Sequence, residues 1–343
     1  MKNEKVVFEG CKEVVLREED IPDPSDNQIL VENSRTLIST GTELTILSGK
    51  YPEGSEWSNY GTFPFYPGYS GVGRVIDVGE GVGDFEIGDR VATNSPHQKY
   101  HLVDLNQQGE TLIDAVAVPN EVTDSEASLH ALATISMNGV RCSKVSLGEC
   151  VVVVGEGIVG QFATMFSRLE GGFPVVAVEV SGKRIEMASK SGATHSVKSD
   201  QESVVDRLKE FNEGRWADVV FEVTGKPELI PWAIRLVKEQ GRFIVLSSPR
   251  GETQIDFHDE VNLPSRIIKG AHVRSHPACE TPYNQWTNER NTELFFRLLE
   301  QGEISVDHLL THEFSYTEAD KAYEMLLSDR TRAMGVILDF SSD

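Results

Sequence analysis

Short hydrophobic runs alternate with amphipathic stretches through the middle of the 343-residue chain. Residues 150–154 contain four consecutive valines, a pattern typical of a strand buried on both faces. The residues that follow, 161–169, have the composition of a helix. The same alternation predicts further strands at 174–180, 217–223, 241–247 and 267–273, and helices at 128–140, 183–191, 203–211 and 228–239. This order predicts an α/β fold with a doubly wound parallel sheet.

The two ends of the chain have a different pattern. Residues 1–125 contain short β-rich runs separated by proline and glycine, which predicts a compact β-rich domain. Residues 292–301 are an amphipathic helical stretch, and 334–340 form a last apolar run that suits a strand. Between them, Thr317 and Asp320 have the spacing of a helix cap before residues 322–327.

A glycine motif connects the valine strand to its helix. Gly155, Gly157 and Gly160 have the G-x-G-x-x-G spacing of a dinucleotide-binding turn, with Ile158 and Val159 between the last two. In such a turn the first glycine permits the tight bend, the second lets a pyrophosphate approach, and the third packs the helix against the strand. The helix N-terminus offers free N–H groups to the phosphates.

The next predicted strand ends in an acidic residue. Glu179 lies about 20 residues after the glycines, the spacing at which a carboxylate reaches the ribose hydroxyls of NAD. A carboxylate there repels a 2′-phosphate, so we expect NAD(H) to be preferred over NADP(H), although Arg184 could counter this. The alternative is a glycine turn of another α/β protein, with Glu179 a solvated strand-end residue.

Composition narrows the choice of partners. The formal net charge is −22, which argues against nucleic acid or an anionic membrane surface as a partner and would suit a high-salt cytoplasm. No apolar run approaches the ~20 residues of a membrane span, and the N-terminus has no apolar signal region. The four cysteines are scattered, which predicts neither a disulfide framework nor a zinc knuckle. We therefore expect a cytoplasmic protein.

Several motifs together resemble the medium-chain dehydrogenase/reductase superfamily. They are residues 68–79 and 88–91, the glycine motif with Glu179, residues 221–225, and the ending from 311 to 340. The resemblance implies a GroES-like β-rich catalytic domain formed by 1–125 and 280–343, and a Rossmann cofactor domain formed by 126–279. It also implies a homodimer or homotetramer.

A closer resemblance is to a branch with a Ser-Thr-Gly-Thr-Glu motif, here residues 39–43. That branch includes bacteriochlorophyllide dehydrogenase-like proteins and the reductase half of two-part dehydrogenases linked to surface sugars. The family's usual zinc ligands correspond here to Thr40, Tyr69 and His130. One imidazole, one phenol and one hydroxyl make a poor zinc site, so we expect no zinc.

The resemblance also implies catalytic candidates, namely Tyr69 and His130 at the zinc-ligand positions and Thr42 at the family's proton-relaying hydroxyl. Thr42, Tyr69 and His130 would form a polar relay that moves the substrate proton in place of a metal. Glu43 matches an acid that orients its neighbours, and His97 would fall in the substrate region with Thr40. The alternatives are a packing phenol at Tyr69, a turn hydroxyl at Thr42 and structural histidines.

The remaining candidates concern cofactor and substrate contacts. The resemblance implies that Thr134 contacts the nicotinamide and that Thr224 and Gly225 line the cofactor site after a buried strand. Ser247 and Ser248 end the next strand and could do the same, or could be ordinary strand-end residues. Trp286 and Arg290 could close over the substrate, or pack together on the surface.

Three functions remain open at this level. The first is a zinc-independent, NAD(H)-preferring oxidoreductase that interconverts an alcohol and a carbonyl on a polar or sugar-like small molecule. The second is a quinone or enoyl reductase acting on a conjugated C=C bond. The third is a non-catalytic protein that keeps the cofactor fold as a sensor or scaffold.

Overall fold

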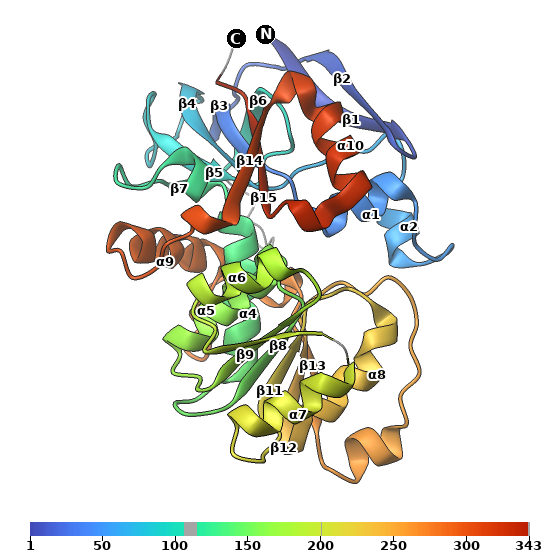
Figure 1. Cartoon of the computed structure of the whole chain (residues 1–343). Helices are drawn as coiled ribbons and strands as arrows, with labels where there is room; N and C mark the ends of the chain where they lie inside the picture. Colours follow the sequence, from blue (N-terminus) through green and yellow to red (C-terminus); the bar gives the residue numbers. More distant parts are fainter. Residues whose placement is uncertain (106–114, 200, 342–343) are drawn as a thin grey trace. The chain divides into compact units, whose positions relative to one another are not determined.

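The computed structural model describes residues 1–105, 115–199 and 201–341. The chain divides into two compact units. One consists of Met1–Thr134 together with His276–Asp343, and the other consists of Ile135–Ser275. The first unit is therefore assembled from both ends of the chain. Figure 1 traces its ends in blue and red and the central unit mainly in green and yellow.

The unit Ile135–Ser275 is built on a parallel sheet, six-stranded over the residues described. The strand order is β10-β9-β8-β11-β12-β13, so the chain reverses direction across the sheet between β8 and β11. This confirms the predicted doubly wound parallel sheet, in which ligands bind beyond the strand ends at the reversal point. The strands are β8 (Val151–Val154), β9 (Val175–Glu179), β10 (His195–Lys198), β11 (Ala217–Glu222), β12 (Val237–Val245) and β13 (Ile267–Gly270).

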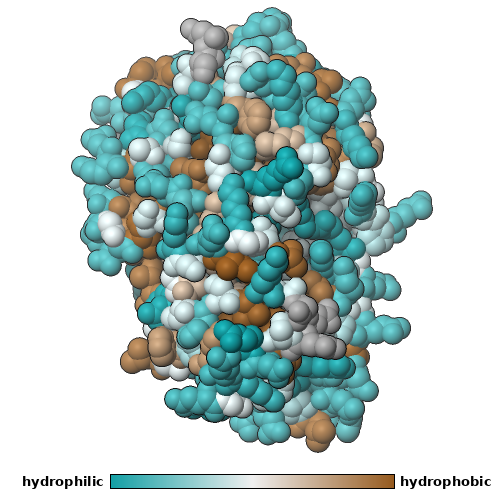
Figure 2. Space-filling model, viewed as in Figure 1, coloured by the Kyte–Doolittle hydropathy of each residue, from teal (hydrophilic) through white to brown (hydrophobic). Residues whose placement is uncertain are grey.

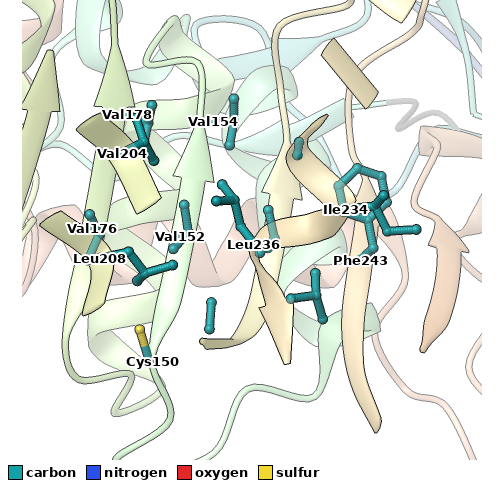
Figure 3. Packing of buried hydrophobic residues seen from close by; sticks show 14 of the residues in the cluster. Cys150, Val152, Val154, Val176, Val178, Val204, Leu208, Ile234, Leu236 and Phe243 are labelled. Atoms are coloured by element: carbon teal, nitrogen blue, oxygen red, sulfur yellow. The ribbon is translucent and has the colours of Figure 1, made fainter. Parts of the chain in front are cut away.

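Both faces of this sheet are buried, which explains the unbroken valine run. Val151 and Val153 point to one face of β8 and Val152 and Val154 to the other, and all four are at most 3% exposed. Figure 3 shows Cys150, Val152 and Val154 of one face packed with side chains of β9, of helix α7 (Gln201–Phe211), of the 3-10 turn Ile234–Leu236 and of β12. The labelled partners are Val176, Val178, Val204, Leu208, Ile234, Leu236 and Phe243.

Helices connect the strands of this unit, and one predicted helix ends earlier than expected. The helix predicted over 228–239 is present as consecutive 3-10 and α-helical turns from Pro227 to Leu236, but its predicted last three residues belong to β12, which begins at Val237. Val237 pairs with Ala217 of β11, so the sheet takes residues whose local pattern favoured a helix. The helices are the end of α4 (His130–Ser143), α5 (Ile158–Leu169), α6 (Gly182–Lys190), α7 (Gln201–Phe211) and α8 (Ile230–Ala233), with 3-10 turns Pro227–Leu229, Ile234–Leu236 and Val273–Ser275 and a π-turn His258–Asn262.

The other unit is β-rich, as predicted for the GroES-like domain. Its larger sheet has the order β14-β15-β3-β4-β5-β7, with β6 also paired to β3, while β1 and β2 form a separate hairpin. β15, from the end of the chain, pairs antiparallel with β3, which explains why both ends belong to one unit. The strands are β1 (Lys2–Gly10), β2 (Glu13–Asp20), β3 (Gln28–Leu37), β4 (Gly71–Val78), β5 (Arg90–Thr93), β6 (Tyr100–Asp104), β7 (Ala115–Ala117), β14 (Leu310–Ser315) and β15 (Gly335–Asp339).

Two helices of the β-rich unit, α9 and α10, begin at residues other than those predicted. Thr287 caps the N-terminus of α9 and accepts from the Arg290 N–H, so this helix begins before the predicted residue 292. The predicted cap formed by Thr317 and Asp320 is wrong, because the N-cap of α10 is Glu318 and makes no side-chain hydrogen bond there. Its helices are α1 (Thr42–Ser48), α2 (Glu56–Tyr60), α3 (Asp124–Ala127), the start of α4, α9 (Asn288–Glu300) and α10 (Ala319–Asp329), with 3-10 turns Asp307–Leu309, Tyr316–Glu318 and Arg330–Arg332.

The surface in Figure 2 is mainly hydrophilic. Hydrophilic residues cover most of the face drawn in Figure 2, with hydrophobic residues in scattered groups. In the described part of the chain no helix is both long and apolar enough to cross a membrane.

Candidate functional site

The glycine turn after β8 has three glycines with three different surroundings. Gly155 has φ 98°, and a Cβ atom there would lie 2.8 Å from Thr224 Cγ2. A Cβ at Gly160 would lie 2.0 Å from the Gly155 carbonyl oxygen, so the helix can approach the turn only without a side chain. A Cβ at Gly157 would meet nothing within 4 Å. The protein thus leaves open space at the glycine that a pyrophosphate would approach.

The helix that follows the turn presents its N-terminus there. Gly157 is the N-cap of α5 and offers no side-chain hydrogen bond to the first turn. Ile158 is buried and Val159 half-buried, and the first N–H groups of the helix have no intrahelical acceptor. A helix N-terminus with these groups unpaired by a cap suits an anion. The turn therefore has the features of a phosphate-binding segment.

Glu179 lies at the end of β9, next to this turn. Its Oε2 accepts a hydrogen bond of 3.0 Å from the backbone N–H of Glu156, and its Oε1 accepts from the N–H groups of Val180 and Ser181. Arg184, on α6, holds a guanidinium nitrogen 3.8 Å from Glu179 Oε2. The carboxylate is therefore fixed beside the glycine turn, with one cation near it.

Glu156, between the first two glycines, is a buried acid that the sequence reasoning missed. Its side chain is fully buried, its Oε1 accepts from the Thr164 hydroxyl at 2.9 Å, and its Oε2 has no hydrogen-bond partner among the described residues. Burial raises the pKa of this carboxyl well above its usual value, and the nearby Glu179 raises it further. Glu156 therefore keeps its proton to a higher pH than an exposed glutamate does.

The neighbouring strand ends in a second buried acid, Glu222. Its Oε1 accepts from the Thr224 N–H at 2.7 Å and from the Thr224 hydroxyl, and its Oε2 accepts from the Ser247 hydroxyl. Gly225 follows with φ 68°. The structure therefore brings the predicted residues Thr224 and Ser247 together through Glu222, whereas Ser248 is exposed. The signal for Glu222 was its position at the carboxyl end of a strand beside the reversal point.

In the β-rich unit, hydroxyl groups gather around Tyr69. The phenol of Tyr69 shares a hydrogen bond with the hydroxyl of Ser39, from the loop between β3 and α1. Burial raises the pKa of Tyr69 to about 12, while the Ser39 and Thr42 hydroxyls act in the opposite direction because they stabilise the phenolate. The structure thus brings the predicted Tyr69 and Thr42 together and adds Ser39, which the sequence reasoning did not single out.

Glu43 contacts the Ser39 backbone next to these hydroxyls and is almost completely buried. Its Oε1 accepts from the Ser39 backbone N–H at 2.8 Å, and its Oε2 accepts from the Tyr323 phenol and lies 3.1 Å from His97 Nε2. The other ring nitrogen of His97 lies 2.7 Å from Thr36 Oγ1. His97 is 0% exposed and both its ring nitrogens are engaged, so it supports the loop from behind and offers no free atom to a substrate.

His130 and Thr134 each hydrogen-bond to a backbone carbonyl. His130 Nε2 lies 3.2 Å from the Thr93 carbonyl oxygen, and burial lowers the pKa of this imidazole to about 4. His130 is therefore neutral at neutral pH, with Nε2–H donating to Thr93. No hydrogen bond in the described structure joins it to Tyr69 or Thr42. Thr134 donates to the Ala131 carbonyl inside α4, and Thr40 is half-buried beside Thr42.

Trp286 and Arg290 contact each other. The Arg290 guanidinium lies 4.7 Å from the centre of the Trp286 ring, and its Nη1 lies 2.8 Å from Glu280 Oε1. The two residues thus form a partly exposed group at the start of α9. This contact agrees with the alternative in which the pair packs together.

The side chains at the three positions that correspond to the family's zinc ligands, Thr40, Tyr69 and His130, do not suit zinc. Thr40 and Tyr69 offer a hydroxyl and a phenol whose pKa is raised to about 12, and the Nε2–H of His130 is committed to a carbonyl. Zinc prefers thiolate, imidazole and carboxylate ligands. Over the described residues, no three His, Cys, Asp or Glu side chains gather as a metal site would require.

Two family models match this chain. The model described as alcohol dehydrogenase GroES-like domain matches residues 25–109, which include Ser39, Thr42 and Tyr69. The model described as zinc-binding dehydrogenase matches residues 159–289. Thr40, Tyr69 and His130 all lie outside that second range, so the match does not bear on their ability to bind zinc.

Known proteins match over nearly the whole chain. The L-threonine 3-dehydrogenase of Pyrococcus abyssi is 24% identical over 344 residues, covering 92% of both chains. An Escherichia coli CFT073 protein described as a short chain alcohol dehydrogenase, solved with NADH, has a TM-score of 0.81 at 18% identity and covers 98% of this chain and 99% of its own. A proposed zinc-binding dehydrogenase from Sinorhizobium meliloti 1021, solved with NADP, has a TM-score of 0.78 at 18% identity over 99% of both chains. At 18% identity these structural matches show the fold alone.

Proposed function

Because the chain belongs to the medium-chain dehydrogenase/reductase superfamily, we propose that it is a zinc-independent, NAD(H)-preferring oxidoreductase. It would interconvert an alcohol and a carbonyl on a polar or sugar-like small molecule. The coarser prediction, a dehydrogenase or reductase that uses a nicotinamide cofactor, is confirmed by the family. Zinc independence, the preference for NAD(H) and the class of substrate are the parts proposed here.

The observation that carries the proposal is the group of hydroxyls around Tyr69. A carbonyl that is reduced develops negative charge on its oxygen, and a hydrogen-bond donor must stabilise this charge and supply a proton. The phenol of Tyr69 is such a donor, and the hydroxyls of Ser39 and Thr42 stabilise the phenolate that remains. In the oxidation direction the same phenolate accepts the alcohol proton.

The cofactor half of the proposal rests on the glycine turn. The open face at Gly157, the uncapped N-terminus of α5 and the fixed carboxylate of Glu179 suit the pyrophosphate and ribose of a dinucleotide. When bound, the nicotinamide supplies or accepts the hydride. The carboxylate of Glu179 would accept from ribose hydroxyls and repel a 2′-phosphate, which supports NAD(H).

A homo-oligomer is also part of the proposal. β13 is the edge strand of its parallel sheet, and Ile267 at its start is 54% exposed. An edge strand with an exposed apolar residue is open to pairing with another chain. Light scattering of the purified protein should give the mass of a dimer or tetramer rather than that of the 38.0 kDa chain.

A substrate panel tests the function. Polyols, sugar alcohols, hydroxy amino acids and their carbonyl forms would be assayed with NAD(H), beside enones and quinones. We expect turnover on the alcohols or carbonyls by enzyme stripped with a chelator, and no gain when zinc is added. Turnover confined to enones, or activity that is lost with one bound zinc and restored by it, would overturn the proposal.

The Tyr69→Phe variant tests the proton donor. Loss of a general acid typically lowers the rate by ~10²–10⁴-fold. We expect kcat to fall by about this factor while the Kd for NADH stays unchanged. An equal loss of turnover and NADH binding would show that Tyr69 is structural.

A further inference from the structure

Ser39 belongs neither to the glycine motif nor to the predicted relay of Thr42, Tyr69 and His130. It lies in the loop between β3 and α1 and is 5% exposed. Its hydroxyl shares a hydrogen bond with the phenol of Tyr69, 30 residues later in the chain. Its backbone N–H donates to Glu43 Oε1 at 2.8 Å. Ser39 is therefore held by its backbone and contacts Tyr69 with its side chain.

The anchor for Ser39 is itself fixed from separate elements. Glu43 Oε2 accepts from the phenol of Tyr323 on α10 and lies 3.1 Å from His97 Nε2, in the loop between β5 and β6. His97 is fixed in turn by Thr36 on β3. A buried carboxylate is stable only when its lone pairs are satisfied, and here three donors satisfy them. These three contacts leave the Glu43 carboxylate little freedom to move away from the Ser39 N–H.

We propose that Ser39 is the positioning residue of Tyr69, and that the Glu43–His97 pair holds Ser39 in place. The inference rests on the proposed function of Tyr69 as proton donor and acceptor. When the Tyr69 Oη–H bond breaks and the proton passes to the substrate oxygen, the electron pair stays on the phenolate oxygen. The Ser39 hydroxyl then donates to that oxygen. In the oxidation direction the phenolate takes the proton of the alcohol and Ser39 returns to its bond with the neutral phenol.

This assignment differs from a packing role in what it predicts for ionisation. Burial makes the phenolate of Tyr69 costly, and the Ser39 hydroxyl offsets part of that cost. A hydrogen bond to a charged group contributes ~1.5–3 kcal/mol. Removing it should therefore slow the proton step by ~10- to 150-fold.

The kinetic test compares Ser39→Ala with Ser70→Ala. Ser70 is also buried, is adjacent to Tyr69 in the chain, and donates to the Ser128 carbonyl at 2.6 Å instead of to Tyr69. We expect Ser39→Ala to lower kcat by at least ~10-fold, to leave the KM for NADH unchanged, and to shift the pH dependence of alcohol oxidation to higher pH. Ser70→Ala should show neither change in kcat nor the shift. Equal behaviour of the two variants would overturn the assignment.

A second measurement does not depend on turnover. Protein labelled with carbon-13 at the tyrosine Cζ would be examined by NMR at neutral pH, with the Tyr69 signal identified by its loss in Tyr69→Phe. Ser39→Ala should shift this signal, as should Glu43→Gln if Glu43 holds Ser39, while Ser70→Ala should leave it in place. An unmoved signal in Ser39→Ala would show that the contact is absent in solution. A shifted signal in a protein that turns over no alcohol or carbonyl would retain the contact and reject the proposed function instead.

Discussion

The carboxylate of Glu43, at the start of α1, accepts a hydrogen bond from the phenol of Tyr323 on α10, 280 residues later in the chain. Both side chains are at most 1% exposed. The bond connects the two sequence segments that make up the β-rich unit at the residue that holds the Ser39 loop. Burial raises the pKa of Tyr323 well above its usual value, and the Glu43 carboxylate raises it further, so the phenol keeps its proton and donates at neutral pH.

Tyr323→Phe should therefore destabilise the β-rich unit. The change leaves a buried carboxylate with one donor fewer, and an unsatisfied buried charged group costs at least ~1–3 kcal/mol. We expect a lower urea midpoint for Tyr323→Phe. The control is Tyr283→Phe, because Tyr283 is 100% exposed and its loss should leave the midpoint unchanged. Identical midpoints for both variants and the wild type would contradict the importance of this bond.

Glu179→Gln should change the choice of cofactor. The amide keeps one acceptor oxygen for the N–H groups around it and removes the charge that repels a 2′-phosphate, while Arg184 remains nearby. Loss of a repulsion worth about 1 kcal/mol corresponds to a roughly fivefold gain in NADPH affinity relative to NADH. Fluorescence titration with both cofactors measures this ratio. Glu186→Gln, an exposed position on α6, should leave it unchanged. A wild type that already prefers NADPH would refute the expectation.

Glu156→Gln should remove a dependence of stability on pH. In the folded protein the pKa of Glu156 lies well above the value of 4.5 that it has in an unfolded chain. As pH rises above 4.5 the unfolded chain loses this proton and the folded protein retains it, so the wild type loses stability with rising pH. Glutamine stays neutral and keeps an acceptor for Thr164.

The measurement is the free energy of unfolding from urea titrations between mildly acidic and neutral pH. The difference between Glu156→Gln and wild type should grow in favour of the variant as pH rises. Glu239→Gln, at an exposed position on β12, serves as the matched control and should follow the wild type. A constant difference across this range would mean that Glu156 is ionised in the folded protein.

His130→Gln should reduce the sensitivity of the protein to acid. The pKa of His130 is lowered from 6.5 to about 4 in the folded protein, so the unfolded chain binds the proton first as pH falls. The wild type therefore loses stability between pH 6.5 and about 4, by up to about 3 kcal/mol from this residue. Glutamine does not titrate and can donate its amide N–H to Thr93.

Urea titrations across this window check the prediction. His101, whose pKa is also lowered to about 4, keeps part of the acid sensitivity in the variant. His258→Gln is the control, because His258 is exposed and its pKa is raised by its bond to Asp259. If His130→Gln has the same pH dependence as the wild type, His130 is protonated in the folded protein.

Much of the cofactor unit could be predicted from local pattern. The valine strand, the spacing of Gly155, Gly157 and Gly160, and the acid at Glu179 are properties of short segments, and a βαβ unit is formed by residues close in sequence. The end of the helix predicted over 228–239 was wrong for the opposite reason, because its last three residues belong to β12. Its local propensity is helical, but Val237 pairs with Ala217 in the sheet, and that pairing depends on a neighbouring strand.

The same distinction between local pattern and tertiary contact applies to the hydroxyl side chains around Tyr69. The sequence by itself determined that Thr40 and Tyr69 carry hydroxyls, and the family resemblance implied that these positions correspond to zinc ligands. Only the tertiary structure decided that Ser39 meets Tyr69, that Glu43 meets His97 and Tyr323, and that His130 donates to Thr93 instead. Side-chain contacts between distant segments depend on how strands pair and helices pack, and hydrophobic periodicity encodes which face is buried but not which polar partner lies opposite.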